Sequence, residues 1–158
     1  MGIAVRRAEI NDNDGIIKLL LQIADFHHKG RPDMFKEGSK KYNRDEFEAI
    51  LQDKDRPIFV AVDDSNTVLG YCFCMITRYE SHAVYHDFTS LYIDDFCVDE
   101  TCRGQGVGKI IFAAVLEYAK EINVYNIDLN VWEFNEGAIK FYESCGFSTR
   151  SRRMEMIL

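Results

Sequence analysis

A glycine-rich stretch in the second half of the chain has the composition of an anion-binding turn. It follows an apolar segment typical of a strand and precedes a segment with helical periodicity. Glycines let the backbone adopt positive φ and approach a ligand closely, and a helix N-terminus offers unpaired N–H donors at the positive end of its dipole. Such a turn suits a pyrophosphate, although a tight turn without a ligand can have the same composition. The stretch consists of Arg103, Gly104, Gln105, Gly106, Val107, Gly108 and Lys109, in which the two cations add charge.

Two familiar nucleotide-binding motifs do not fit the spacing of this stretch. A Walker loop needs glycine at position 103 and serine or threonine at position 110, where the chain has Arg103 and Ile110. A dinucleotide fingerprint needs two residues between its second and third glycines, and only Val107 separates Gly106 from Gly108. A phosphate-bearing ligand would therefore be bound through another motif.

Two consecutive acids interrupt the apolar strand before the turn. Asp94 and Asp95 lie within residues 91–98, where burying a charge is costly unless it has a partner or a use. A carboxylate could serve there as a base, because an amine with a pKa near 10 is an ammonium at neutral pH and attacks only after losing a proton. Successive strand residues face opposite sides, so we expect only one of the two acids to face a cleft. A structural hydrogen bond to a neighbouring loop is the alternative use.

A third group of candidate residues lies in a helix near the end of the chain. Asn135 can cap this helix and Gly146 can end it. Tyr142, with an ordinary pKa of about 10, is protonated at neutral pH and can act as a general acid. Capping by Asn135 and packing of Tyr142 beside Phe141 would explain the same residues without any chemistry.

Together the motifs resemble the GNAT superfamily of N-acetyltransferases. Arg103-x-x-Gly106-x-Gly108 matches the acetyl-CoA signature of that family. The family's later motif, N-x-x-A-x-x-F-Y-x-x-x-G-F, is matched by Asn135, Ala138, Phe141, Tyr142, Gly146 and Phe147. The stretch around Asp94 is similar to that of spermidine/spermine and glucosamine-phosphate acetyltransferases, which have Glu where this chain has Asp94. The order of elements matches along the whole chain, and the motif-level likeness covers residues 91–147.

The resemblance implies a cosubstrate and a role for each candidate residue. Main-chain amides of residues 103–109 would hold the pyrophosphate of acetyl-CoA. Main-chain groups near Cys97 and Val98 would align its pantetheine and polarise the thioester carbonyl. Asp94 would be the base, directly or through a water, or would anchor the amine, with Asp95 as the alternative. Tyr142 would protonate the departing thiolate. The further positions implied to contact acetyl-CoA are Asn135, Ala138 and Phe141.

These residues need a framework that brings them together, and the sequence predicts one α+β domain over residues 1–158. The resemblance implies a central mixed, mostly antiparallel sheet, flanked by helices and splayed at the acetyl-CoA site. Asp12 is expected to cap the first helix, and Asn43 with Glu46 to form a capping box for the second. Patterning predicts strands over residues 3–8, 58–62, 68–79, 91–98 and 126–132, and terminal strand material over 147–158. It predicts helices over residues 16–26, 44–53, 109–121 and 135–143.

Composition narrows the class of partner. The 158 residues carry a net charge of -7, and the sequence pI is about 5.1. This balance argues against nonspecific binding to nucleic acid or an anionic membrane, and it is compatible with a cationic substrate. No signal-like region and no apolar run of about 20 residues is present, so we expect a cytoplasmic location. Five cysteines without a C-x-x-C pair predict no metal site.

The sequence thus predicts an acetyl-CoA-dependent N-acetyltransferase whose acceptor is a primary amine of a small molecule, attacked directly in a ternary complex. The acceptor is expected near residues 26–28 and the connection 79–88. A protein or peptide amine is an alternative acceptor, and a noncatalytic CoA-binding sensor domain is an alternative of a different class. A homodimer is expected, because the terminal strand would leave an edge that needs covering.

Overall fold

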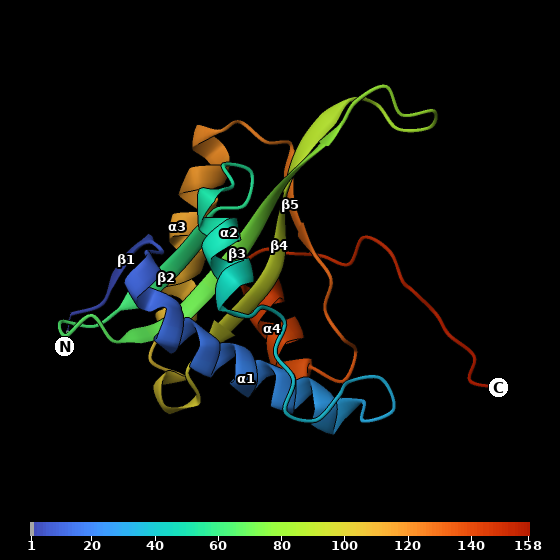
Figure 1. The fold of residues 1–158 in the computed structure, drawn as a ribbon. Helices are drawn as coiled ribbons and strands as arrows, with labels where there is room; N and C mark the ends of the chain where they lie inside the picture. The colour runs from blue at the N-terminus through green and yellow to red at the C-terminus, as the bar shows by residue number, and fades with distance from the viewer. Residues whose placement is uncertain (1) are drawn as a thin grey trace.

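The computed structural model describes residues 2–158, which form one open sheet with helices on both faces (Figure 1). The strands are β1 (Ala4–Arg7), β2 (Ile58–Val62), β3 (Val68–Tyr79), β4 (Phe88–Val98) and β5 (Asn126–Leu129). The helices are α1 (Asn13–Gly30), α2 (Arg44–Gln52), α3 (Val107–Glu121) and α4 (Glu136–Ser144), with two short 3-10 helices, η1 (Ile10–Asp12) and η2 (Glu100–Cys102). The order of elements through α4 is the predicted one.

The sheet is mixed and mostly antiparallel, as predicted. Its strands lie in the order β1-β2-β3-β4-β5, and the first four pair antiparallel with their neighbours. β5 pairs parallel with β4, because α3 carries the chain back to the start of β4 before β5 begins. Among the described residues, this is the one parallel pair of the sheet.

Two apolar clusters lie on opposite faces of the sheet. α1 and α2 cover one face, where Ile16, Leu19 and Leu20 of α1 are fully buried. α3 covers the other face through residues that include Ile111 and Val115. Each such side chain stabilises the fold by about 1.5–3 kcal/mol when it leaves water. The periodic residues of both helices therefore face the sheet as their spacing predicts, except Phe26 of α1, which is exposed and packs against His27 and Phe134.

The helix starts follow the capping signals in two cases of three. Asn43 accepts a hydrogen bond from the Glu46 amide, and the Glu46 carboxylate accepts one from the Asn43 amide, which confirms the capping box. Asn135 caps α4 by accepting from the Ala138 amide. Asp12 lies at the start of α1 but does not cap it. Its carboxylate binds Arg6 and the amide of Glu9 instead.

Several predicted boundaries were wrong by a few residues. β4 begins at Phe88 rather than at position 91, because β3 and β4 form a long hairpin that pairs from Tyr79 and Phe88 onward. β5 ends at Leu129, three residues early, where the chain leaves β4. α3 begins at Val107, directly after the last glycine of positive φ in the turn.

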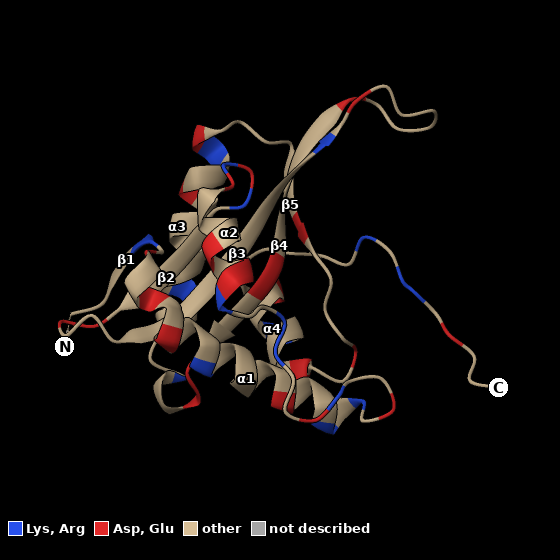
Figure 2. Cartoon of the chain, in the orientation of Figure 1, with Lys and Arg blue, Asp and Glu red and all other residues tan. Residues whose placement is uncertain are grey.

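The predicted terminal strand is also wrong. Residues 147–158 form neither strand nor helix, and they extend away from the sheet toward the C-terminus (Figures 1 and 2). Arg31 bonds to Glu155 of this tail, and Arg150 lies 3.8 Å from Asp128. The apolar tail residues Met154, Met156, Ile157 and Leu158 are all exposed. Alternating residues alone do not make a strand where no neighbouring edge pairs with them.

Within residues 2–158, no helix has both the length and the apolar character needed to span a membrane.

Candidate active site

The parallel pair of strands opens halfway along β4. Pairing between β4 and β5 runs from Ser90 with Asn126 to Ile93 with Leu129. β4 continues to Val98, and within residues 2–158 no strand pairs with that side of residues 94–98. The predicted splay is therefore present. It leaves main-chain groups around the predicted residues Cys97 and Val98 without a strand partner on that side.

The glycine-rich turn lies directly beyond this opening. Gly104 and Gly106 have φ of 76° and 83°, a region that L side chains rarely adopt. A Cβ placed on either glycine would meet no atom within 4 Å, so the surface over the turn is open. Gly106 is also the N-cap of α3, whose first N–H groups have no partner within the helix. The turn therefore fits an anionic group, as the sequence predicts.

The third glycine of the turn has a packing role. A Cβ on Gly108 would lie 3.1 Å from Phe141 and 3.6 Å from Val98, so α3, α4 and β4 converge on this position. Phe141 packs within the second apolar cluster, and its ring centroid lies 5.4 Å from that of Phe96. The Val107 side chain is buried in the same cluster. Val107, Gly108 and Phe141 are all predicted acetyl-CoA contacts. Because the side chains of Val107 and Phe141 are packed in the core and Gly108 has none, these residues can offer a ligand mainly their main-chain groups.

The polar side chains of the turn point in different directions. Arg103 is exposed and makes no ion pair with any residue of 2–158, so its guanidinium is available for an anion. Gln105 donates to the Thr101 carbonyl. Lys109 reaches the Ser144 carbonyl at 3.4 Å, at the C-terminal end of α4 where a cation is favourable. Of Arg103, Gln105 and Lys109, only Arg103 therefore has a charged group at the surface that no described residue engages.

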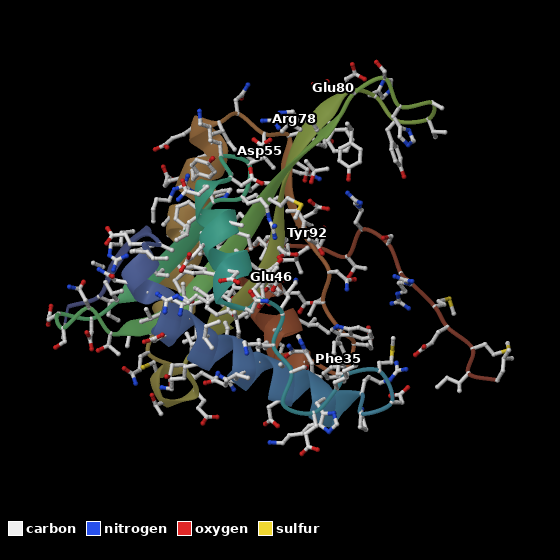
Figure 3. The ribbon with its side chains drawn as sticks, viewed as in Figure 1. Phe35, Glu46, Asp55, Arg78, Glu80 and Tyr92 are labelled. Carbon is white, nitrogen blue, oxygen red and sulfur yellow. The ribbon has the colours of Figure 1, made fainter. Side chains whose placement is uncertain are left out.

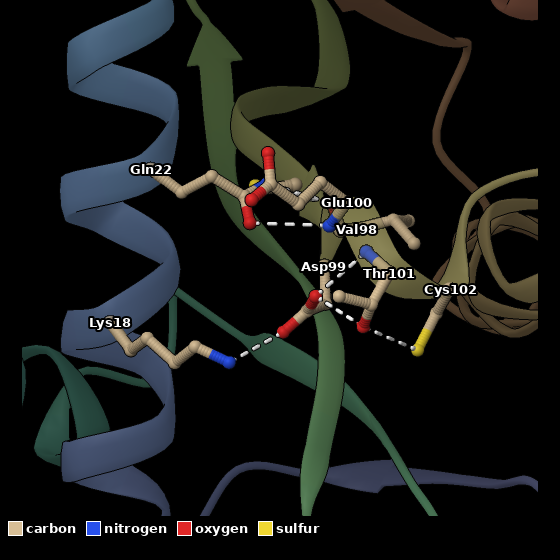
Figure 4. A network of polar contacts seen from close by, with 8 residues as sticks. Lys18, Gln22, Val98, Asp99, Glu100, Thr101 and Cys102 are labelled. Carbon is tan, nitrogen blue, oxygen red and sulfur yellow. Dashed lines mark hydrogen bonds and ion pairs between the residues drawn. The ribbon is translucent and has the colours of Figure 1, made fainter.

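A polar network that was not predicted from the sequence joins α1 to the start of the turn (Figure 4). The Asp99 carboxylate accepts from Lys18 at 2.7 Å and from the amide and hydroxyl of Thr101. Its hydrogen bond with Lys18 lowers the pKa of Asp99 to about 2. Gln22 donates to the Val98 carbonyl and accepts from the Glu100 amide. The network fixes the open end of β4, and the polar pair Lys18 and Gln22, four residues apart on α1, is its signal in the sequence.

The two acids of β4 lie on the same face of the sheet, which corrects the expectation from alternation. The pairing with β3 shifts by one residue between Phe73–Asp95 and Cys74–Ile93, so Asp94 is the extra residue of a β-bulge. Asp94 accepts a hydrogen bond from the Tyr42 hydroxyl, and Asp95 accepts one from the Tyr71 hydroxyl at 3.2 Å. The rings of Tyr42 and Tyr71 both pack on Phe73, on the face that α1 and α2 cover.

The environments of the two acids differ. Asp94 also accepts from Lys41, whose ammonium lies 2.9 Å from its carboxylate and 2.7 Å from its carbonyl oxygen. The position of Tyr42 is supported by Arg56, which donates to its hydroxyl at 2.8 Å. Burial raises the pKa of Asp95 to about 6, against the opposing effects of the Lys41 charge and the Tyr71 hydrogen bond. A carboxyl of this kind is mostly ionised at neutral pH and can still accept a proton.

Tyr142 lies on α4 and reaches β4 from the opposite face of the sheet. Its ring meets Phe96 edge to face at 6.2 Å, one residue beyond Asp95. Burial raises the pKa of Tyr142 well above its ordinary value, so the hydroxyl is protonated at neutral pH. The hydroxyl makes no hydrogen bond within the described chain. Tyr142 therefore has the protonation state of an acid and packs as a core residue at the same time.

Asn135 is the N-cap of α4, and Ala138 lies in its first turn. The Asn135 side-chain oxygen accepts from the Ala138 amide at 3.1 Å, so capping uses that oxygen. The side-chain nitrogen of Asn135 is left to donate to a ligand. Capping and ligand binding by Asn135 are thus compatible, and the Ala138 amide is already engaged.

One of the two segments expected near the acceptor lies beside the opening. His27 of α1 stacks on Phe35 at 5.1 Å, and Phe35 meets Trp132 edge to face at 5.2 Å, in the segment that follows β5. The β3–β4 connection lies elsewhere. In Figure 3, Glu80 marks where the hairpin extends beyond the sheet, away from Phe35. The group around Phe35 is therefore the better placed wall for an acceptor.

Comparisons with known proteins agree with the predicted family. The profile of the Acetyltransferase (GNAT) family matches residues 22–147. The L-ornithine N5-acetyltransferase of Arabidopsis thaliana is 29% identical over 61% of this chain and 41% of its own length. The peptidyl-lysine N-acetyltransferase YjaB of Salmonella typhimurium is 25% identical over 96% of this chain and 88% of its own length.

A solved structure shows the same fold over nearly the whole chain. A mutant of the BH1408 protein from Bacillus halodurans matches with a TM-score of 0.94 and 32% identity, over 98% of this chain and 99% of that one. Because the family profile covers more than half of the sequence, the chain belongs to the GNAT acetyltransferase family. The predicted fold and family are confirmed, whereas the roles of individual site residues stay predictions.

Proposed function

We propose that this member of the GNAT family transfers an acetyl group from acetyl-CoA to a primary amine of a small molecule, by direct attack in a ternary complex. The observation that carries the proposal is the opening between β4 and β5, with the glycine turn at its end. When bound, acetyl-CoA supplies the acetyl group and a thiol leaving group. The open surface over Gly104 and Gly106 supports its binding there.

The residues of the turn and of β4 would divide the binding of acetyl-CoA. The first amides of α3 and the free guanidinium of Arg103 would bind phosphates. Main-chain groups near Cys97 and Val98 would bind along the unpaired side of β4. Asn135 would donate through its side-chain nitrogen. We propose no side-chain contact from Lys109 or Phe141, since each is engaged elsewhere.

We propose that Asp94 anchors the acceptor as an ammonium. The Lys41 ammonium supports this proposal, because it donates to the carboxylate and to the carbonyl oxygen of Asp94. The proton then leaves to Asp94, directly or through water, as the sequence predicts. Asp95 is the second candidate for this step, because its pKa of about 6 suits a base at neutral pH. Tyr142 would return a proton to the thiolate from the other face of the sheet.

The acceptor class is proposed from charge and from the relatives. Two carboxylates at one opening favour a cationic amine, and the ornithine acetyltransferase among the relatives acts on a small one. The peptidyl-lysine acetyltransferase among them gives a second candidate, a lysine of a protein or peptide. A noncatalytic CoA-binding domain is the third candidate function, and acetylation of either acceptor would exclude it.

A panel of amines distinguishes these readings. Thiol release from acetyl-CoA is measured with ornithine, a polyamine, an amino sugar and a lysine-containing peptide. Turnover of at least one small amine, at a higher kcat/KM than the peptide, is the expected result. Preference for the peptide would move the proposal to protein acceptors. Binding of CoA without turnover of any of the four would support the sensor.

The homodimer and the cytoplasmic location remain proposals. The exposed apolar residues of the tail, among them Met154, Met156 and Leu158, support association of two copies, because burying apolar side chains between them would be favourable. Light scattering should give about twice the 18.3 kDa mass of the chain. A single species of 18.3 kDa at working concentration would show a monomer.

A further inference from the structure

The amine of one of the protein's own lysines lies at the position proposed for the acceptor. Lys41 belongs to the irregular segment between α1 and α2, and its ammonium donates to the carboxylate of Asp94 at 2.9 Å and to the main-chain oxygen of Asp94 at 2.7 Å. Asp94 directly follows Ile93, the last residue of β4 that pairs with β5. The ammonium is therefore held at the mouth of the opening.

We infer that Lys41 is an intramolecular acceptor, and that the protein acetylates its own Lys41 side chain when no other amine occupies Asp94. The inference rests on the proposed acetyl-CoA activity and adds a modification site to it.

Lys41 is free to change its position at small cost to the fold. Its side chain is 42% exposed, whereas that of Asp94 is 13% exposed. The Asp94 carboxylate keeps the hydroxyl of Tyr42 as a partner, and Arg56 holds that hydroxyl in turn. Because the Lys41 side chain is partly exposed, water can replace Asp94 as the partner of its ammonium, so Lys41 can leave Asp94 and return to it without unfolding its neighbours.

The other lysines near the site have other partners. Lys18 pairs with Asp99, and Lys109 bonds to the Ser144 carbonyl. Lys40, the neighbour of Lys41 in sequence, is exposed and makes no hydrogen bond within residues 2–158. The segment thus contains two adjacent lysines, only one of which lies on an acid of β4, and Lys40 is a matched control.

The reaction balances without any further reagent. The Lys41 ammonium gives one proton to Asp94 or to water, and its nitrogen attacks the acetyl carbonyl of acetyl-CoA. The new N–C bond forms as the C–S bond breaks, and the thiolate takes a proton to leave as CoA. The product is Nε-acetyl-lysine, which has no charge and cannot restore the ion pair with Asp94. Acetylation should therefore remove the internal competitor of external amines at Asp94.

The test is to incubate the purified protein with carbon-13-labelled acetyl-CoA without an acceptor, then map the label by mass spectrometry. Label on Lys41 should exceed label on Lys40. The rate per molecule should not change with protein concentration, as expected for a reaction within one chain. Lys41→Arg keeps the charge and should lose the label, and Lys40→Arg should keep it. Asp94→Asn should slow labelling by roughly 10²-fold.

The outcomes separate this inference from the proposed function. If an external amine is acetylated and Lys41 stays unlabelled, self-acetylation is wrong and the proposed function stands. Equal labelling of Lys40 and Lys41, unchanged by Asp94→Asn, would mean ordinary chemical acetylation and would also overturn the inference. If acetyl-CoA does not bind at all, both proposals fail together.

Discussion

The two halves of β4 differ in what holds them. Residues 88–93 pair with β3 on one side, and most of them pair with β5 on the other, so main-chain hydrogen bonds fix them. Residues 94–98 lose the second partner, and side chains take over: Lys41 and Tyr42 bind Asp94, and Gln22 binds the Val98 carbonyl. Where β4 lacks its second strand partner, the main-chain groups that no side chain engages are available to a ligand. The candidate site occupies that half.

Removing a charge from residues 94–98 should lower the catalytic rate far more than it lowers the stability of the fold. Asp94→Asn keeps the shape and loses the charge that holds an ammonium. The rate should fall by roughly 10²- to 10⁴-fold, and raising the pH should recover part of it by supplying free amine. Steady-state kinetics of Asp94→Asn and Asp95→Asn across pH measure both. Full activity of Asp94→Asn beside an inactive Asp95→Asn would assign the base to Asp95.

A smaller effect is expected from Tyr142, which reaches the open half from the other face. Tyr142→Phe keeps the ring packing on Phe96 and removes only the hydroxyl. Turnover should fall by roughly 10²-fold at neutral pH, the low end for general acid–base catalysis, because the thiolate loses its proton donor. The loss should shrink at high pH, where a thiolate of pKa about 8.5 leaves without a proton. Wild-type turnover of this variant at pH 7 would mean that Tyr142 only packs.

Replacing Asp95 should raise the stability of the fold, whereas the two variants above should lower activity. The pKa of Asp95 is about 6 in the folded protein and near 3.9 in the unfolded chain. Between these values the folded state binds more protons, so stability falls as the pH rises from about 4 to about 6. Asp95→Asn should remove this penalty and stabilise the fold at pH 7, on the order of 2 kcal/mol. Urea unfolding at pH 4 and pH 7 checks it, and a variant less stable than wild type at both would contradict it.

The features that could be predicted from the sequence are those that depend on residues close to one another along the chain. Local signals were sufficient for the glycine turn and for the caps at Asn43 and Asn135, because each depends on residues within a few positions. The bulge at Asp94 was out of reach, since it depends on the register between β3 and β4. So was the Lys41–Asp94 contact, which joins residues 53 positions apart. The strand predicted after Phe147 is wrong for the same reason, because an alternating pattern does not indicate which strand edge would pair with it.

Thermal unfolding with increasing acetyl-CoA tests most directly whether the glycine turn binds this cosubstrate. At about 100 times the dissociation constant, bound acetyl-CoA should raise the midpoint by roughly 5–10 °C for a chain of this size. Gly106→Val should lose the shift, because φ of 83° excludes a β-branched residue from the turn. Gly137→Ala, in α4 with open space around its added Cβ, should keep it. A wild-type midpoint that neither acetyl-CoA nor CoA moves at saturation would contradict acetyl-CoA binding by this protein.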